Sequence, residues 1–361
     1  MALQRRRFKS FDLHRAADLL HQDAAAAVLD SALRLASGVA RKRRKPPDWQ
    51  YCARVSTTPS LFWRRLNQRH GEQLNQFGYE NVKRHQAFRY FTWSWRWYTL
   101  PWNRHFRFLV THTSPGVWLK AARERQDLDS QTWDQLPGNR AHRWLNVFAT
   151  RLLWVYASTT ADSAVMAVGE PLLGNPPPIT WGGQLISQDL ANSALETSAI
   201  RRAMKGSDPG SIVEVGAGYG RTGHALLSIY PNAKYTVVDV EPALSLSRWY
   251  LTTLFPDRDL TFLIPEEATP ERLGRVDLSV SISSLQEMTR EQADGYITLF
   301  DSITDKVVFL KQWKHRTNWS DRIAWKFSKL ALPPRWRLEF WETSPVQTDF
   351  AQAAWSIQTE Q

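Results

Sequence analysis

A glycine-rich turn between two apolar segments constrains the fold of this chain more than any other feature. The segment Ser211-Ile-Val-Glu-Val-Gly-Ala-Gly-Tyr-Gly-Arg221 predicts a buried strand, a sharp turn and the start of a helix. Tyr235–Val240 predicts a second strand, which carries Asp239 nineteen residues after Gly220. Glycines let the backbone approach a nucleotide-like ligand closely, and a carboxylate at this place accepts the hydroxyls of a ribose. The sequence therefore predicts a nucleotide-type cofactor site.

The spacing of the glycines separates two kinds of cofactor. A dinucleotide fingerprint needs Gly-x-Gly-x-x-Gly, and Arg221 stands where its third glycine would be. Gly216, Gly218 and Gly220 instead form Gly-x-Gly-x-Gly, opened by Glu214. This pattern resembles the S-adenosylmethionine loop of class I methyltransferases. The cofactor-binding residues that the resemblance implies are Glu214, Gly216, Ala217, Gly218, Tyr219, Gly220, Asp239, Val240 and Ser284.

Strand and helix patterns alternate in the second half of the chain, which favours a doubly wound α/β sheet. We expect a Rossmann-like sheet of seven strands, the last two forming a terminal hairpin, as in class I methyltransferases. The predicted strands are Ile212–Val215, Tyr235–Val240, Asp259–Ile264, Asp277–Ser284, Lys306–Leu310, Arg335–Trp341 and Phe350–Ile357.

The composition of the remaining residues indicates how the chain is divided into domains. With 361 residues and 43% hydrophobic content, two domains with packed cores are expected. Residues 48–180 are rich in Trp and predict a mainly helical cap, with one apolar helix face in Arg143–Tyr156. Their aromatic side chains, crowded in Phe88–Tyr98, suit either core packing or a cleft that stacks on sugars or bases. The proline-rich Gly174–Thr180 marks the boundary, so residues 181–361 are the predicted methyltransferase domain.

The net charge of +11 is concentrated in a basic N-terminal arm. Residues 1–45 hold eleven Lys and Arg against four Asp, and the arm ends at Pro46-Pro47. Apolar residues from Leu20 to Leu35 recur at helical spacing, which predicts an amphipathic helix within it. We expect the arm, residues 1–47, to be solvated or to dock on the rest of the protein. The alternative use of the arm is a weak contact with a membrane surface or a polyanion.

The sequence offers no sign of a secreted or membrane-spanning protein. No apolar run reaches the roughly 20 residues of a transmembrane helix, and the N-terminus lacks the apolar stretch of a signal peptide. The single cysteine, Cys52, excludes an internal disulfide and a thiolate metal cluster. A cytoplasmic location is expected, and the oligomeric state stays open.

Further segments resemble one group, the sugar O-methyltransferases of bacterial glycan loci. The matching stretches lie between Gly174 and Lys314, and the basic arm is not among them. The resemblance implies methylation of a sugar hydroxyl, with a sugar, nucleotide-sugar or glycan as acceptor. The stretches are Gly174-Asn-Pro, Ile186-Ser-Gln-Asp-Leu-Ala-Asn-Ser193, Glu214 to Arg221, Val238-Asp-Val-Glu-Pro-Ala-Leu244, Ser283-Ser-Leu-Gln-Glu-Met288 and Leu310-Lys-Gln-Trp-Lys314.

Candidate residues for methyl transfer follow the fourth and fifth predicted strands. Ligands of open parallel sheets bind beyond the carboxyl ends of the strands, where these segments converge. A sugar hydroxyl benefits from a general base, and Glu287 and His315 are the candidates. The expected substrate-binding residues are Gln286, Lys311, Gln312 and Trp313. No compact carboxylate–histidine cluster demands a metal, so none is predicted.

Other functions share parts of this pattern. A methyltransferase acting on RNA would explain the basic arm, but an Asn/Asp-Pro-Pro-Tyr type of motif is missing after the fourth strand. A methyltransferase acting on a small non-sugar acceptor or lipid stays open. A dinucleotide-dependent oxidoreductase fits the fold but not the glycine spacing, and a non-enzymatic glycan-binding protein would not need the complete cofactor loop.

Overall fold

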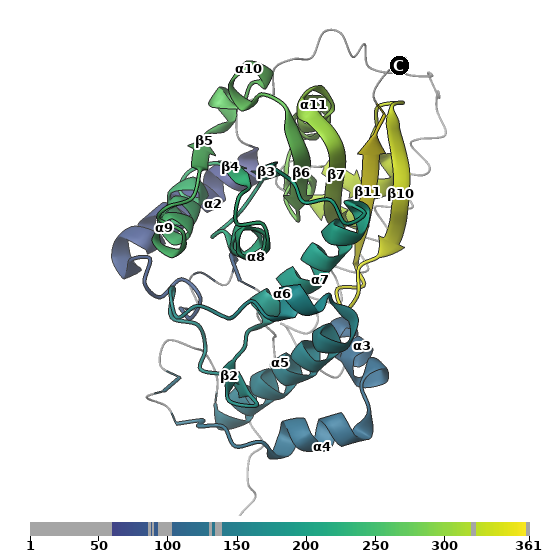
Figure 1. Cartoon of the computed structure of the whole chain (residues 1–361). Coiled ribbons are helices and arrows are strands. Elements are labelled where there is room, and N and C mark those ends of the chain that lie inside the picture. Colours follow the sequence, from purple (N-terminus) through teal and green to yellow (C-terminus); the bar gives the residue numbers. More distant parts are fainter. Residues whose placement is uncertain are drawn as a thin grey trace, which may run out of the picture. The chain divides into compact units, whose positions relative to one another are not determined.

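The computed structural model describes residues 60–85, 88, 90–92, 103–129, 132–133, 139–318 and 323–358 (Figure 1). All of them belong to one compact unit, which spans Trp49–Gln361. The predicted basic arm and its amphipathic helix, Cys52 and the aromatic segment from Trp93 to Trp102 lie outside the described residues.

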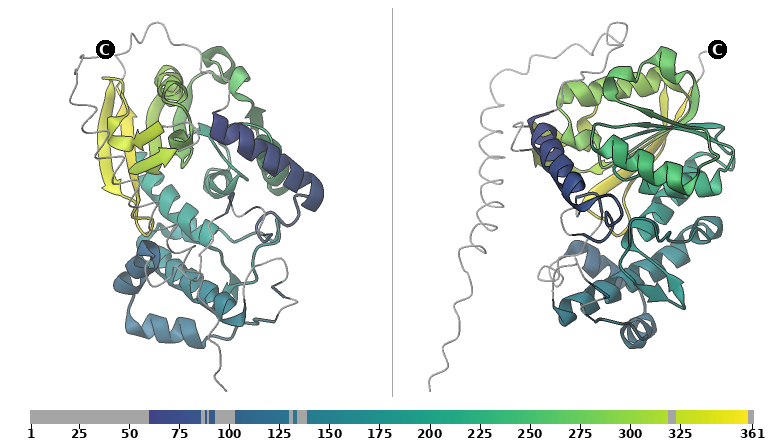
Figure 2. Two further views of the ribbon diagram at one scale, coloured as in Figure 1. Left: turned by 180° about the vertical axis from the view of Figure 1, so that it is seen from behind. Right: turned by 90° about the vertical axis from the view of Figure 1, so that its left-hand side faces the viewer.

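A seven-stranded sheet is the main element of this unit (Figures 1 and 2). From one edge to the other, its strands stand in the order β5-β4-β3-β6-β7-β11-β10. The strands β5, β4, β3, β6 and β7 are parallel, whereas β11 pairs antiparallel with both β7 and β10. The predicted Rossmann-like sheet and its terminal hairpin are therefore confirmed, and the fold is that of class I methyltransferases. The bounds are β3 Ser211–Val215, β4 Lys234–Val238, β5 Leu260–Leu263, β6 Val276–Ile282, β7 Thr304–Trp313, β10 Trp336–Thr343 and β11 Phe350–Ile357.

Helices cover both faces of the sheet, which explains why its strands read as apolar runs. In β3, Ile212 packs into one core cluster, while Val213 and Val215 pack into the other. The first cluster includes side chains of α7, α8 and α9, and the second includes side chains of α11, on the opposite face (Figure 2). These helices are α7 Gln188–Ala203, α8 Arg221–Ile229, α9 Ala243–Leu254 and α11 Arg290–Ile303, with the short α10 Pro270–Leu273 before β6.

The helices before the sheet form a third core cluster with the start of α7. The predicted helix at Arg143–Tyr156 lies inside α5. Its expected apolar face is partly wrong; the residues predicted for that face are Trp144, Val147, Phe148, Leu152 and Val155. Trp144 is 38% exposed and stacks on Phe148 at 5.3 Å, whereas Leu153 and Trp154 are buried. The reason is that α5 packs against α3, α4 and α7 together, so it buries more than one stripe. The elements are α3 Arg104–His112, α4 Pro115–Arg123, α5 Arg140–Thr160, α6 Ser163–Met166, β1 Thr180–Trp181 and β2 Gln184–Leu185.

The helix α2 (Leu61–Phe77) lies beside the methyltransferase sheet (Figure 2). Leu74 of α2, with Val82 and Phe88 of the following turn, belongs to the same core cluster as Leu226 of α8. Residues far before the predicted boundary at residue 180 thus complete the core beside the glycine loop. That boundary itself stays a prediction.

Candidate functional site

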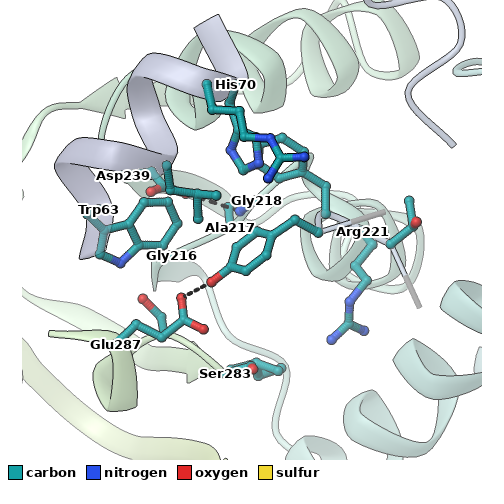
Figure 3. Close-up of a pocket in the computed structure, with 16 residues that line it drawn as sticks. Trp63, His70, Gly216, Ala217, Gly218, Arg221, Asp239, Ser283 and Glu287 are labelled. Carbon is teal, nitrogen blue, oxygen red and sulfur yellow. Dashed lines mark hydrogen bonds between the residues drawn. The ribbon is translucent and has the colours of Figure 1, made fainter. Parts of the chain in front are cut away.

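A cavity of about 490 Å³ opens at the carboxyl ends of the parallel strands and is bordered by α2 on its other side (Figure 3). Clefts of this size, with a few polar groups among apolar ones, are typical of cofactor and substrate sites. Its lining joins residues from three parts of the chain: Trp63, Leu66, Arg69 and His70 of α2; Tyr90, Phe91 and Thr92; and Gly216, Ala217, Gly218, Arg221, Asp239, Ile282, Ser283, Ser284 and Glu287 from the sheet edge.

The glycine loop has the geometry that its sequence predicts. Gly216 and Gly218 adopt φ of 83° and 61°, the left-handed region that favours glycine. A Cβ at Gly216 would collide with the side chain of Ser284, the second residue after the end of β6. The loop therefore brings bare backbone to the wall of the cavity.

Asp239 ties this loop to the end of β4. Its Oδ2 accepts a hydrogen bond from the N–H of Gly218 at 3.0 Å, and its Oδ1 accepts one from the N–H of Val240 at 2.8 Å. The side chain is only 8% exposed but lines the cavity, and burial raises the pKa of its carboxyl to about 7. The remaining lone pairs of the carboxylate are placed to accept further hydrogen bonds from a ligand.

A smaller cavity of about 40 Å³ continues from the first one past Asp239. It shares Trp63, Gly216, Asp239 and Ser284 with the larger cavity, and its other walls are mostly apolar. Val240, predicted as a cofactor residue, lies here. The remaining lining residues are Ser60, Val215, Val238, Pro265, Met288, Gln292 and Tyr296. An aromatic or heterocyclic ring suits such a niche because its flat faces need apolar walls.

Polar side chains of α7 support the glycine loop from behind. The hydroxyl of Tyr219 donates to Oδ2 of Asp189 at 2.9 Å, and Arg221 donates to Ser193 at 2.9 Å and to Glu196 at 2.6 Å. The stretch Ile186–Ser193 thus has a structural use that its sequence did not disclose, since it anchors the loop and the first turn of α8.

Lys311 completes a buried ionic cluster rather than lining the cavity. Its Nζ lies 2.6 Å from Oε1 of Glu196, which also pairs with Arg221, and it donates a second hydrogen bond to Gln347. Lys311 and Glu196 are 2% and 0% exposed. The charge of Asp189 also acts on Arg221, so the two cations lie among two carboxylates, and Arg221 extends from this cluster to the cavity wall.

Glu287 is the predicted catalytic residue that the structure brings to the cavity. It lies in η4 (Leu285–Glu287), 6% exposed, on the same wall as Gly216 and Ser283 (Figure 3). The Tyr90 hydroxyl donates to its Oε2 at 2.5 Å, and Arg316 donates to its Oε1 at 2.7 Å. Burial raises the pKa of the Glu287 carboxyl, while the charge of Arg316 opposes this rise.

His315, the second predicted base, lies elsewhere. It is exposed in β8 (His315–Asn318), which pairs with β9 (Ile323–Lys326), and it is absent from the cavity lining. The difference arises because β7 continues to Trp313, three residues beyond the predicted strand, before the chain turns into β8. A role for His315 in catalysis stays a prediction without geometric support.

The predicted substrate residues Gln286, Gln312 and Trp313 form a link between η4 and β7. Gln286 donates to the carbonyl of Ser283 at 3.1 Å and accepts from the backbone N–H of Trp313 at 2.6 Å. Gln312 donates to the carbonyl of Ser281 at 3.1 Å. Both glutamines are fully buried, so these bonds hold the edge of the sheet next to Glu287. Their part in substrate binding also stays a prediction.

Three predicted cofactor residues lie just outside the cavity wall. Glu214 is 1% exposed and accepts a hydrogen bond from Tyr235 at 2.7 Å, and burial raises the pKa of its carboxyl to about 7. Tyr219 points to Asp189, and Gly220 precedes α8 with φ of 98°. They shape the loop from behind, whereas Gly216, Ala217, Gly218, Asp239 and Ser284 line the cavity itself.

Sequence patterns did not point to the residues of α2 and of the turn after it. Trp63, His70, Tyr90 and Phe91 line the cavity, and their rings contact one another in a chain from Trp63 through Tyr90 to His70 and Phe91. The aromatic richness of residues 48–180 was the only signal, and it did not distinguish core residues from this wall.

The described residues contain no group of three or more His, Cys, Asp or Glu that could hold a metal ion. In the same part of the chain, every helix is too short or too polar to cross a membrane.

Solved structures that are similar to this chain include several methyltransferases. The magnesium protoporphyrin IX methyltransferase of Synechocystis, solved with bound S-adenosylmethionine, is 14% identical, with 47% of this chain and 83% of that chain covered and a TM-score of 0.36. The 1,6-didemethyltoxoflavin N1-methyltransferase of Burkholderia thailandensis, solved with S-adenosylhomocysteine, is 15% identical, with 45% and 76% covered and a TM-score of 0.36. No protein-family model matches the sequence, and no curated protein matches it.

Proposed function

We propose that this chain is an S-adenosylmethionine-dependent O-methyltransferase that acts on a sugar hydroxyl in glycan or polysaccharide biosynthesis. One observation carries the proposal: the glycine loop and Asp239 lie in the same cavity wall as the buried carboxylate of Glu287. A cofactor cradle and a proton acceptor on one cavity are what methyl transfer to a hydroxyl requires.

The residues of the cavity fit the cofactor. The left-handed glycines at 216 and 218 let the backbone approach the methionine part, and the guanidinium of Arg221 in the cavity wall would attract its carboxylate. Asp239 would accept the ribose hydroxyls, and the apolar niche around Val240 would hold adenine. When bound, S-adenosylmethionine supplies a methyl group on a positively charged sulfur.

Glu287 is the group that we propose to remove the proton of the acceptor. An in-line displacement needs the acceptor oxygen to be aligned with the methyl group and to lose its proton as the new bond forms. Burial raises the pKa of the Glu287 carboxyl, which strengthens it as a base, while the charge of Arg316 opposes this rise and favours the ionised form. Tyr90 orients the carboxylate through its hydrogen bond to Oε2.

The aromatic wall supports a sugar as the acceptor. Trp63, Tyr90 and Phe91 line the cavity together with the glycine loop, and flat aromatic faces stack on the apolar C–H faces of sugar rings. The polar edges of a sugar would then face the polar groups of the cavity. The acceptor that we propose is therefore a free sugar, a nucleotide-sugar or a glycan.

The function can be tested by offering the purified full-length protein a panel of acceptors with S-adenosylmethionine. The panel holds nucleotide-sugars, deoxysugar glycans, an unmodified transfer RNA and small hydroxylated acids, with methyl transfer followed by mass spectrometry. We expect a mass gain of one methyl group on a carbohydrate. Transfer to RNA or to a non-sugar acid alone would overturn the sugar assignment, and binding of NAD in place of S-adenosylmethionine would overturn the methyltransferase assignment.

A further inference from the structure

A second cavity, of about 730 Å³, lies apart from the one that contains the glycine loop. It is bordered by α3, by the end of α5, by α7, by the loop before β3 and by the turn between β10 and β11. The linings of the two cavities have no residue in common. Ligand pockets in proteins have volumes of roughly 300–1,000 Å³, so a cavity of this size can hold a ligand of its own.

The helix α7 separates the two cavities. In Figure 1 it lies between α8 and β11, and it contacts both. Asp189 and Ser193 anchor the glycine loop, whereas Ser198 and Arg202 line the second cavity. Because an α-helix has 3.6 residues in a turn, Ser198 lies roughly half a turn around the helix axis from Asp189. A ligand of the second cavity would therefore bind on the opposite face of the helix that supports the glycine loop.

The charged side chains of the second cavity are mostly paired with one another. Nε of Arg201 lies 3.1 Å from Oδ2 of Asp162, and Nη2 of Arg202 lies 2.5 Å from Oε1 of Glu342. Asp208 is a third carboxylate of the lining. A phosphate or another anion would have to compete with these carboxylates for the two arginines. Paired groups still offer N–H donors and oxygen acceptors, so the lining favours a neutral ligand with many hydrogen-bonding groups.

Two tyrosine hydroxyls also belong to this lining. Within the described part of the chain, neither Tyr156 nor Tyr230 has a hydrogen-bond partner for its hydroxyl. The inaccessible side-chain atoms that lack a partner do not include these two oxygens, so solvent, and hence a ligand, reaches both. Burial raises the pKa of Tyr230 to about 12, which keeps its hydroxyl protonated and able to donate. Phe108 contacts Tyr156 edge to face, with ring centres 5.2 Å apart, and adds an apolar corner.

A sugar has the chemistry that this lining requires. Its hydroxyls donate and accept hydrogen bonds around the edge of an uncharged ring. Its C–H faces are apolar and pack on aromatic rings such as those of Phe108 and Tyr156. A nucleotide or another phosphate ester would instead bring negative charge next to carboxylates. A lipid chain would displace water from the tyrosine hydroxyls without replacing its hydrogen bonds.

We propose that the second cavity is a carbohydrate-binding site, in which the hydroxyls of Tyr156 and Tyr230 form hydrogen bonds with a neutral oligosaccharide whose ring faces pack on Phe108. The inference goes beyond the proposed function, because it concerns binding on the opposite face of α7 from the cofactor cavity. It holds for any methyl acceptor, so the site and the proposed function can fail independently.

Four variants of the full-length protein test the site. Tyr156→Phe and Tyr230→Phe each remove one hydroxyl and keep the ring. Ser207→Trp fills the cavity, because Ser207 is an exposed residue of its lining. Ser302→Trp is the matched control: Ser302 is also exposed, its hydroxyl also donates to the carbonyl three residues before it at 2.7 Å, and it lies outside both linings. Thermal melting checks that each variant is folded, and if Ser207→Trp does not fold, the two phenylalanine variants decide.

Binding is measured by saturation-transfer NMR titration with maltotetraose, cellotetraose, chitotetraose and mannotetraose. We expect the wild type to bind at least one of them. Tyr156→Phe and Tyr230→Phe should each weaken that binding about two- to tenfold, the effect of one lost hydrogen bond, and Ser207→Trp should weaken it more than about tenfold. Ser302→Trp should match the wild type, and every variant should bind S-adenosylhomocysteine within about twofold of the wild type, because distant sites act independently.

Other results would overturn the inference. The wild type could bind none of the oligosaccharides, or the two phenylalanine variants and Ser207→Trp could bind them as tightly as the wild type, which would put the sugar elsewhere. Equal weakening by Ser302→Trp would show a general effect of a surface tryptophan. Competition by inorganic phosphate or by spermidine would make the cavity a site for ions. Methyl transfer is measured separately, and its presence or absence decides the proposed function alone.

Discussion

The substitution Asp239→Ala tests the proposed cofactor site separately from acceptor binding and from catalysis. Asp239 is 8% exposed, and its carboxylate oxygens already accept one hydrogen bond each, from the backbone N–H of Gly218 and from that of Val240. The ribose hydroxyls would use the remaining lone pairs. The substitution therefore removes the ligand's acceptor and also the bond that holds Gly218.

The magnitude follows from these contacts. Hydrogen bonds to a charged group contribute about 1.5–3 kcal/mol, and each 1.4 kcal/mol is a factor of ten in affinity. Asp239→Ala should thus weaken binding of S-adenosylhomocysteine by roughly 10- to 150-fold. Loss of the Gly218 clamp moves the result toward the upper end, because the loop must then be ordered by the ligand.

Isothermal titration calorimetry with S-adenosylhomocysteine at pH 8 measures this effect. Asp259→Ala is the matched control, since Asp259 precedes β5 at the opposite edge of the sheet and forms only an exposed ion pair with Lys234 at 3.6 Å. The control should bind within twofold of the wild type. An affinity of Asp239→Ala within twofold of the wild type would refute the assignment of Asp239 to the ribose.

Four further outcomes are expected. Because burial raises the pKa of Asp239 to about 7 and ribose hydroxyls donate to its ionised form, S-adenosylhomocysteine should bind roughly tenfold more weakly at pH 6 than at pH 8, and Asp239→Asn should remove that dependence. Gly216→Ala, whose Cβ would collide with Ser284, should bind the same ligand more than about tenfold more weakly by calorimetry. Glu287→Gln should lower turnover by about 10²–10⁴ with cofactor affinity nearly unchanged, and His315→Gln should have a smaller effect; full activity of Glu287→Gln would exclude it as the base. Deleting residues 1–45 should leave cofactor affinity within about threefold, whereas a truncated protein that fails to fold would make the arm part of the core.

The glycine loop could be predicted from sequence because its information is local. Gly216, Gly218 and Asp239 lie just after the ends of two strands that pair directly, and the apolar runs before them fix the strands to within a few residues. The spacing of these residues in the sequence is enough to predict the turn and the carboxylate that accepts a hydrogen bond from it. The seven strands and their terminal hairpin followed from the resemblance of the loop to a known fold, and the sheet confirms them.

The direction of side chains at the strand ends could not be predicted in the same way. Successive side chains of a strand point to opposite faces, so a small error in where the strand ends changes which residues face the cavity. Lys311 faces Glu196 of α7, and the extension of β7 to Trp313 takes His315 away into β8. Such outcomes depend on which helix covers each face.

No local sequence pattern could predict that α2 forms a wall of the cavity. Trp63 and His70 share a cavity with the glycine loop only because α2 lies beside a loop that comes about 140 residues later in the chain. Nothing in the helix itself distinguishes these residues from those that fill a core. Tertiary packing alone brings them to Asp239 and Glu287.

The anchoring of the glycine loop by α7 has a consequence for transplanting this cofactor site into another chain. A fragment that begins at Asp208 would keep all seven strands, and by topology it would count as a complete fold. It would lose Asp189, Ser193 and Glu196, leaving the hydroxyl of Tyr219 without its acceptor and two cations without their shared anion. Breaking a buried ion pair destabilises by about 3–5 kcal/mol, a large part of the stability of an ordinary domain. A portable unit of this site therefore has to include α7, and also α2 and the turn after it, since these complete the core beside the glycine loop.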